Sequence, residues 1–330
     1  MYNKIIGFIL QIILFFLFAL AGCTGFHQVS PQLKQNLGVY VPVADKSDQA
    51  SFAPIFLVQK NHLPRNRIGS PAAEITESGE ERVFINSEVP AIFVQQFPFS
   101  TENESYVNFV YRIHFKEVPG IHLTRGKNGG ILIIITVKDS QQPVLVTTAH
   151  TCGCYLSFFP TSFLPKTAFP ENWDINGQKV FGEHLPGILA LTPFPLTDPT
   201  QRISLAIRGD THRIMDIQFD STQTLRTKYG VIDTPLRPME DLQSIPLGDS
   251  TISFFEKDGS RTGYVKGSYK PFERLLMSWW SFDLRVGEDK AYWPKEKTGA
   301  IFYTSLKYWA REDSDMRNFP RFLKYWGWNL

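Results

Sequence analysis

The sequence predicts a mainly β protein, an antiparallel sandwich or a barrel-like arrangement of strands. Three observations support this: segments that alternate between apolar and polar residues, one long β-branched run, and frequent punctuation by 22 prolines and 23 glycines. Alternation with a period of two is typical of a strand with one buried face. Many short strands separated by turn residues are typical of sandwiches and barrels.

Strand-like segments follow one another through the middle of the chain. In residues 107–116 the odd positions are apolar and the even ones mostly polar, so we expect a half-buried strand with Asn, Arg, His and Lys side chains facing outward. Residues 131–137 (ILIIITV) are rich in β-branched side chains, which predicts a strand buried on both faces. A strand over 143–148 leads directly into His150. Later strands are expected over residues 202–208, 214–219 and 251–256.

The carboxy-terminal part is rich in tryptophan, and we expect an aromatic subdomain from about residue 270. Six of the seven tryptophans lie here: Trp279, Trp280, Trp293, Trp309, Trp326 and Trp328. Aromatic rings bury large areas, so we expect them to hold this part against the sheet; the alternative is a stacking platform for cell-wall glycan. A short helix is predicted over 301–312, where four side chains share one face: Phe302, Leu306, Trp309 and Ala310.

The amino terminus has the order of a secretory signal. Lys4 precedes an apolar run over residues 5–21. That run is close to the roughly 20 residues that span a bilayer, so a retained transmembrane helix is the alternative. The four residues Leu20-Ala21-Gly22-Cys23 resemble the lipobox of bacterial lipoproteins. The resemblance implies removal of residues 1–22 and attachment of diacylglycerol and a fatty acyl chain such as palmitate to Cys23.

The same resemblance implies an address in the bacterial cell envelope. More than one acyl chain gives durable membrane anchoring, and Thr24 in place of Asp is similar to the pattern sorted to the outer membrane, facing the periplasm. Residues 23–60 are expected to form a flexible tether, since they are polar and patternless as far as about residue 50. Residues 61–330 then form the β-rich envelope domain.

Composition limits the partners of this domain. Apolar residues make up 43% of the chain and charged residues 20%, which is the balance of a globular protein. The formal net charge is only +2, and no Lys/Arg-rich run is present, so nucleic acid is excluded as an expected partner. The expected partners are the membrane, reached through the lipid anchor, and a cell-wall glycan or an envelope protein.

One segment combines several chemically reactive side chains: His150, Cys152 and Cys154. In a fully extended strand the first and last of these would lie roughly 13 Å apart, so the segment must bend to bring all three together. Gly153 permits that bend because glycine adopts positive φ readily. Thiolate and imidazole groups are ligands for zinc or copper. The segment therefore predicts a metal site, with His114 or His184 as a possible further ligand.

Two other interpretations of this segment remain open. In an oxidising compartment Cys152 and Cys154 could take part in thiol–disulfide exchange, or one of them could act as a nucleophile beside His150. Alternatively, both thiols are small core residues next to a tight turn. No complete catalytic signature surrounds the segment, so the sequence leaves open whether the protein is an enzyme.

Overall fold

The computed structural model describes residues 36–43, 47–101, 104–138, 142–191, 200–293 and 295–330. The predicted signal peptide and the lipobox-like run Leu20-Ala21-Gly22-Cys23 lie outside the described residues. Within the described parts, no helix has the length and apolar character needed to cross a membrane.

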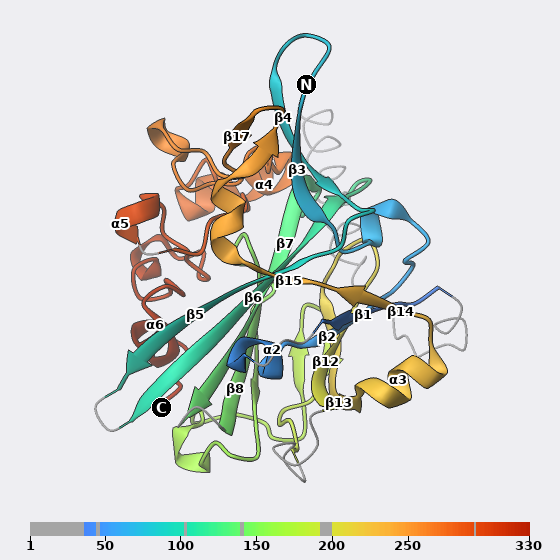
Figure 1. Ribbon diagram of the computed structural model, residues 1–330. Coiled ribbons are helices and arrows are strands. Elements are labelled where there is room, and N and C mark those ends of the chain that lie inside the picture. Colours follow the sequence, from blue (N-terminus) through green and yellow to red (C-terminus); the bar gives the residue numbers. More distant parts are fainter. Residues whose placement is uncertain (1–35, 44–46, 102–103, 139–141, 192–199, 294) are drawn as a thin grey trace, which may run out of the picture.

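Two sheets form the framework of the fold, and the prediction of a mainly β protein is confirmed (Figure 1). The six-stranded sheet has the order β15 (Leu236–Pro238), β5 (Ile92–Ser100), β6 (Ser105–Val118), β7 (Gly126–Lys138), β8 (Gln142–His150), β9 (Ser157–Pro160). The five-stranded sheet has the order β13 (Ile214–Ser221), β12 (Gln201–Ile207), β2 (Ile55–Val58), β1 (Gly38–Pro42), β14 (Val231–Thr234). Both are open sheets as far as the structure describes them, and three of their strand pairs are parallel: β15–β5, β12–β2 and β1–β14.

Short elements surround these sheets. The two-stranded ribbons are β3–β4 (Ser70–Ile75, Glu81–Asn86), β10–β11 (Gln178–Val180, Glu183–Leu185) and β16–β17 (Ile245–Leu247, Ser250–Ile252). The α-helices are α2 (Asp48–Phe52), α3 (Thr222–Lys228), α4 (Pro271–Ser281), α5 (Lys295–Thr298) and α6 (Phe319–Tyr325). Single turns of 3-10 helix are η2 (Pro64–Asn66), η3 (Lys166–Ala168), η5 (Met239–Gln243), η6 (Gly259–Arg261) and η7 (Tyr308–Ala310).

The six-stranded sheet lies between two apolar cores. On one face Ile133 and its neighbours pack with Phe56 and Leu205 of the five-stranded sheet. On the other face Leu132 and its neighbours pack with Phe302 and Phe322 of the carboxy-terminal region. In Figure 1 this region, from α5 to α6, lies on one side of the sheet, and β2, β12 and β13 lie on the other. The prediction that residues 131–137 are buried on both faces is confirmed.

The polar side of β6 differs from the sequence prediction. Arg112 and His114 were expected to face solvent, but both are 0% exposed because the carboxy-terminal region covers this face. The Arg112 Nε donates to His114 Nε2 over 2.8 Å, and its Nη1 donates to the carbonyl of Lys290 over 2.7 Å. The His114 ring packs edge-on against Phe93 and Phe254. The alternating pattern predicted the strand correctly, but it did not predict that another part of the chain covers the polar face of that strand.

The tether prediction is wrong for the described residues before 60. Residues 38–42 and 55–58 form β1 and β2, which pair with each other and lie inside the five-stranded sheet. β1 is buried throughout, and Tyr40 packs in the core between the two sheets. The run GVYVP is a short apolar strand, and its brevity within a polar region is why it resembles tether in the sequence.

The helix predicted over 301–312 is also wrong. The backbone N–H of Phe302 donates to the Asp315 carboxylate over 3.1 Å, and that of Thr304 donates to the carbonyl of Ser314 over 3.1 Å. These bonds hold residues 302–304 extended, and only Tyr308–Ala310 forms a helical turn. The Trp-rich region does contain short helices, as predicted, but they are α4, α5 and α6.

The tryptophans divide into two groups. Trp293 and Trp328 are buried, and the Trp328 ring packs against Phe158 of β9 and against Trp173. These rings hold the carboxy-terminal region against the sheet, as the sequence predicts. In contrast, Trp279, Trp280 and Trp309 are exposed on the surface, and they stabilise no core that the structure describes.

Candidate metal centre

The chain bends sharply where β8 ends at His150. The Gly153 N–H donates to the carbonyl of His150 over 2.8 Å, and the His150 N–H donates to the carbonyl of Cys154 over 2.8 Å. Gly153 has φ +95°, and a Cβ at this position would lie 2.1 Å from the carbonyl oxygen of Tyr303. Glycine alone satisfies both the positive φ and the close approach. The expected bend at Gly153 is confirmed.

This bend brings three ligand atoms together. One ring nitrogen of His150 and the sulfurs of Cys152 and Cys154 all lie within 4.8 Å of one another, and both cysteines are free thiols. Metal bonds of about 2.3 Å to sulfur and 2.0 Å to nitrogen place tetrahedral ligand atoms about 3.5–3.8 Å apart. The group therefore needs a contraction of only about 1 Å to close on a metal ion.

The imidazole of His150 is oriented for this role. Its Nε2 lies 3.0 Å from the carbonyl oxygen of His212. A carbonyl only accepts, so Nε2 carries the proton and Nδ1 keeps the lone pair that binds a metal. Metal-binding histidines are commonly held by such a second bond. Burial, together with the nearby charge of Lys270, lowers the pKa of His150 to about 3, so the ring is neutral at ordinary pH.

The two thiols have different acidities. Burial acts to raise the pKa of Cys152, but a hydrogen bond from Cys154 and the charge of Lys270 bring it below its ordinary value. Burial raises the pKa of Cys154 well above its ordinary value. The pair therefore consists of one acidic thiol, Cys152, and one thiol that stays protonated and donates to it. A thiolate is the form that binds metal or attacks an electrophile.

Buried charged groups adjoin the thiols. The Lys270 Nζ lies 3.3 Å from Asp289 Oδ2, and the Thr151 hydroxyl donates to the other oxygen of the same carboxylate. Glu273 is also buried, and burial raises its pKa. Ionised groups in a protein interior persist when they are paired, so the Lys270–Asp289 pair supplies a fixed field beside Cys152.

A cavity opens on the sulfur side of the bend. It has a volume of about 160 Å³, and its lining includes Cys152, Cys154, Glu273, Met277, Tyr303 and Leu306. A water molecule occupies about 30 Å³ of liquid, so the cavity has room for water or for a small apolar molecule. A much smaller cavity of about 20 Å³ lies between His150, His212, Lys270 and Asp289. The thiols can therefore be reached from the larger cavity.

His114 and His184, the other two predicted ligands, lie elsewhere. His114 pairs with Gly130 of β7, whereas His150 pairs with the next residue, Ile131. Successive residues of a strand point to opposite faces, so His114 and His150 lie on opposite faces of the sheet. His184 is exposed on β11. Among the described residues, the metal-binding group contains only His150, Cys152 and Cys154.

Several residues of this site have no signal in the sequence. His212 lies between β12 and β13, far along the chain from His150. The triplet Glu288-Asp289-Lys290 is typical of a solvated turn, yet all three side chains are buried. The one available signal is in α4, where Glu273 stands in a largely apolar helix.

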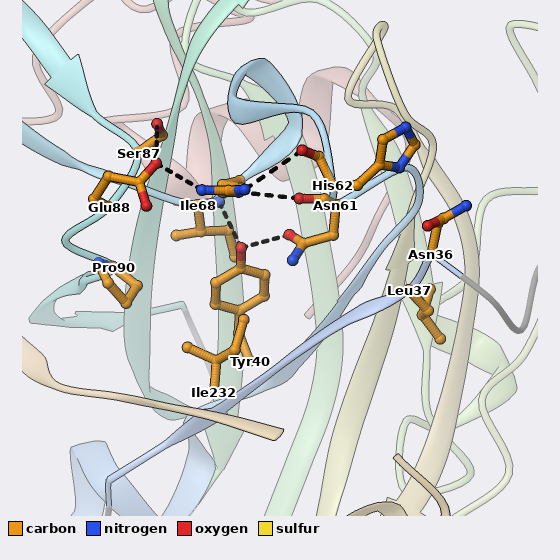
Figure 2. Close-up of a pocket in the computed structure, with 11 residues that line it drawn as sticks. Asn36, Leu37, Tyr40, Asn61, His62, Ile68, Ser87, Glu88, Pro90 and Ile232 are labelled. Atoms are coloured by element: carbon orange, nitrogen blue, oxygen red, sulfur yellow. Dashed lines mark hydrogen bonds and ion pairs between the residues drawn. The ribbon is translucent and has the colours of Figure 1, made fainter. Parts of the chain in front are cut away.

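A wider cavity lies at the edge of the five-stranded sheet (Figure 2). Its volume is about 440 Å³. The Tyr40 hydroxyl donates to Asn61 over 2.6 Å, and Arg67 pairs with Glu88 over 2.6 Å. Four of the polar side chains that line the cavity are thus paired with one another. The cavity therefore presents no group of reactive side chains comparable with the bend at Gly153.

Comparison of the chain with protein-family models, with curated proteins and with solved structures finds no match.

Proposed function

We propose that this chain is a lipid-anchored bacterial envelope protein that binds a soft transition metal, zinc or copper, at His150, Cys152 and Cys154. The observation that carries the metal proposal is the approach of the three ligand atoms to within 4.8 Å at one bend. The anchor is supported by the sequence Leu20-Ala21-Gly22-Cys23. The outer membrane, with the domain facing the periplasm, is the proposed address.

The donor set favours a soft ion. Two sulfurs and one imidazole are the ligands that select copper(I) or zinc over magnesium or calcium. Zinc prefers four ligands, and sites with three protein ligands keep one position for water or substrate. The cavity beside Cys152 and Cys154 provides the space for that fourth ligand. With zinc, the site would then have the composition of a catalytic rather than a closed structural centre.

Metal analysis tests the proposal. The full chain, purified without chelator and again after reloading with zinc or copper(I), should retain one ion in elemental analysis. Cys152→Ser should lose it, and the exposed His184→Ala serves as the matched control that keeps it. Trace metal that does not rise on reloading would exclude the metal function.

A second candidate function is thiol chemistry at Cys152. The observation that favours it is the lowered pKa of this thiol, which accepts a hydrogen bond from Cys154 and lines the 160 Å³ cavity beside the bend. Mass spectrometry of the alkylated protein before and after reduction separates the two functions. A thiol–disulfide protein shows a state lighter by two hydrogens that reduction removes. A metal protein shows two thiols that zinc protects from alkylation.

A further inference from the structure

Helix α4 presents its apolar side to solvent. Its inward side includes Glu273 and Ser281, which are 4% and 0% exposed. Its outward side carries Leu275, Leu276 and two tryptophans: Leu275 is 71% exposed, Leu276 51%, Trp279 71% and Trp280 54%. A surface helix of a globular protein normally has the opposite arrangement, with its apolar stripe against the core.

The exposed apolar surface continues beyond the helix. The Phe282 ring lies 5.3 Å from the Tyr308 ring, which lies 5.0 Å from that of Trp309, so the end of α4 adjoins η7. We call this surface the α4 face, and its members are Leu275, Leu276, Trp279, Trp280, Phe282, Leu284, Tyr308 and Trp309, each more than half exposed. The three indoles alone expose roughly 300–450 Å². The largest apolar patch on a typical monomer is about 300–600 Å² in total, so the α4 face is large enough to be a binding surface.

We propose that the α4 face inserts into the interfacial layer of a lipid bilayer. Tryptophan and tyrosine prefer the headgroup level of a membrane, where one end of the ring is apolar and the other hydrated. Leucine and phenylalanine on the same side of an amphipathic helix bury in the acyl boundary. The α4 face thus has the residue types of a helix that lies in the membrane plane.

Charge complementarity supports a lipid rather than a protein partner. Within residues 271–286 and 305–310, all of which the structure describes, the exposed charged side chains are Arg274 and Lys307. Glu273 is buried, and Asp283 accepts a hydrogen bond from Tyr303. Basic side chains beside an apolar surface bind anionic headgroups.

The chemistry of the α4 face disfavours a glycan. Sugar rings need polar partners for their hydroxyls in addition to an aromatic platform. The Trp279 Nε1 already donates to the carbonyl of Leu276 over 2.9 Å. Leu275 and Leu284, exposed on the same surface, supply no polar group. An aliphatic surface of this kind matches acyl chains better than carbohydrate.

Membrane contact through α4 requires neither the metal site nor acylation at Cys23. The α4 helix nevertheless adjoins the 160 Å³ cavity beside the thiols. Met277 of α4 and Leu306 line that cavity together with Cys152.

Tryptophan quenching tests the proposal. The full chain is mixed with vesicles of phosphatidylcholine and phosphatidylglycerol whose acyl chains carry bromine. All seven tryptophans lie at or after Trp173, so the amino-terminal apolar run adds no emission. We expect the brominated lipid to quench Trp279, Trp280 and Trp309, which are three of the seven tryptophans. The wild-type emission should fall by a corresponding fraction. The variant Trp279→Phe/Trp280→Phe/Trp309→Phe keeps the apolar surface and should lose the quenched component.

Two further variants complete the experiment. Trp293→Phe removes a buried emitter and should leave the quenched component intact. Arg274→Gln/Lys307→Gln should weaken quenching in anionic vesicles only. Equal fractional quenching in the wild type and the triple variant, or none in either, would overturn the proposal. Rings shielded from iodide but insensitive to bromolipid would assign the face to a protein or a second copy, and would overturn it as well.

Discussion

The Nε2 of His150 lies 3.0 Å from the carbonyl oxygen of His212, and this contact joins the two sheets of the protein. His150 ends β8 of the six-stranded sheet, and His212 lies between two strands of the five-stranded sheet. His212 is itself held by a stack on Phe115 at 3.9 Å and by Asn66. The candidate metal centre is thus formed at the junction of two layers, and its geometry depends on both.

Replacement of Gly153 should destabilise the protein strongly. In Gly153→Ala, the new Cβ meets the carbonyl of Tyr303 at 2.1 Å, and φ is +95°. Gly182→Ala is the matched control, since Gly182 has φ +87° with nothing within 4 Å of a Cβ. The control should cost about 1–2 kcal/mol from the left-handed backbone alone, and Gly153→Ala should cost at least about 2 kcal/mol more. Urea unfolding measures both, and equal losses would refute the close approach.

The metal-free protein should lose stability as the pH falls from about 6.5 toward 3. Burial lowers the pKa of His150 and of His212 from 6.5 to about 3. Below pH 6.5 the unfolded chain therefore binds protons that the folded chain cannot, and unfolding becomes easier. The stability contributed by the two neutral imidazoles is complete above pH 6.5. It declines between 6.5, the pKa in the unfolded chain, and about 3, the pKa in the folded chain.

The stability contributed by the Asp210 carboxylate is lost in a lower pH range. Asp210, held by Lys60 and Arg65, has its pKa lowered from 3.8 to about 2 despite partial burial, so its contribution is lost only below about pH 4. The urea midpoint measured at pH 7, 6 and 5 separates the two effects. A midpoint that stays constant over this range would contradict the burial of neutral imidazoles.

The acidity of Cys152 should depend on its neighbour Cys154. Burial acts to raise the pKa of Cys152, and the hydrogen bond from Cys154 lowers it. Cys154→Ala removes the donor, so the Cys152 pKa should rise, whereas Cys154→Ser retains a hydroxyl donor and should hold it down. Thiolate absorbance against pH reports the change. The same pKa in both variants would mean that the hydrogen bond has no influence.

Arg112 should be intolerant of lysine. Its guanidinium donates at once to His114 and to the carbonyl of Lys290, and a lysine ammonium cannot reproduce that fork. A hydrogen bond to a charged group contributes about 1.5–3 kcal/mol, so Arg112→Lys, which loses one of the two bonds, should lower the unfolding free energy by about that amount. Arg82, half of an exposed pair with Glu74, is the matched control, and Arg82→Lys should change stability by less than about 1 kcal/mol.

The strand pattern predicted much of this fold because periodicity reports which residues share a face. It predicted the buried strand at residues 131–137 and the strand that contains Arg112. The bend at Gly153 was predicted separately, from the distance between His150 and Cys154 in an extended strand. The strand pattern could not predict that Arg112 is buried, because the covering layer comes from residues near 290. Periodicity within one segment carries no information about a distant segment that packs on it.

The candidate site was predictable in its ligands but not in its surroundings. His150, Cys152 and Cys154 are close in sequence, so one bend brings them together. The Lys270–Asp289 pair depends on the packing of α4 and of the segment around Asp289 against β8. In α4 the apolar residues suggest a buried face, yet Trp279 and Trp280 point to solvent. Only the three-dimensional structure shows which residues of α4 are buried and which are exposed.

X-ray absorption spectroscopy of the full chain loaded with zinc or copper(I) reports directly on the atoms bound to the metal. We expect two sulfur ligands at about 2.3 Å and an imidazole nitrogen at about 2.0 Å from the metal, with the sulfur signal reduced in Cys152→Ser. A spectrum containing only oxygen and nitrogen neighbours would contradict a metal centre at His150, Cys152 and Cys154.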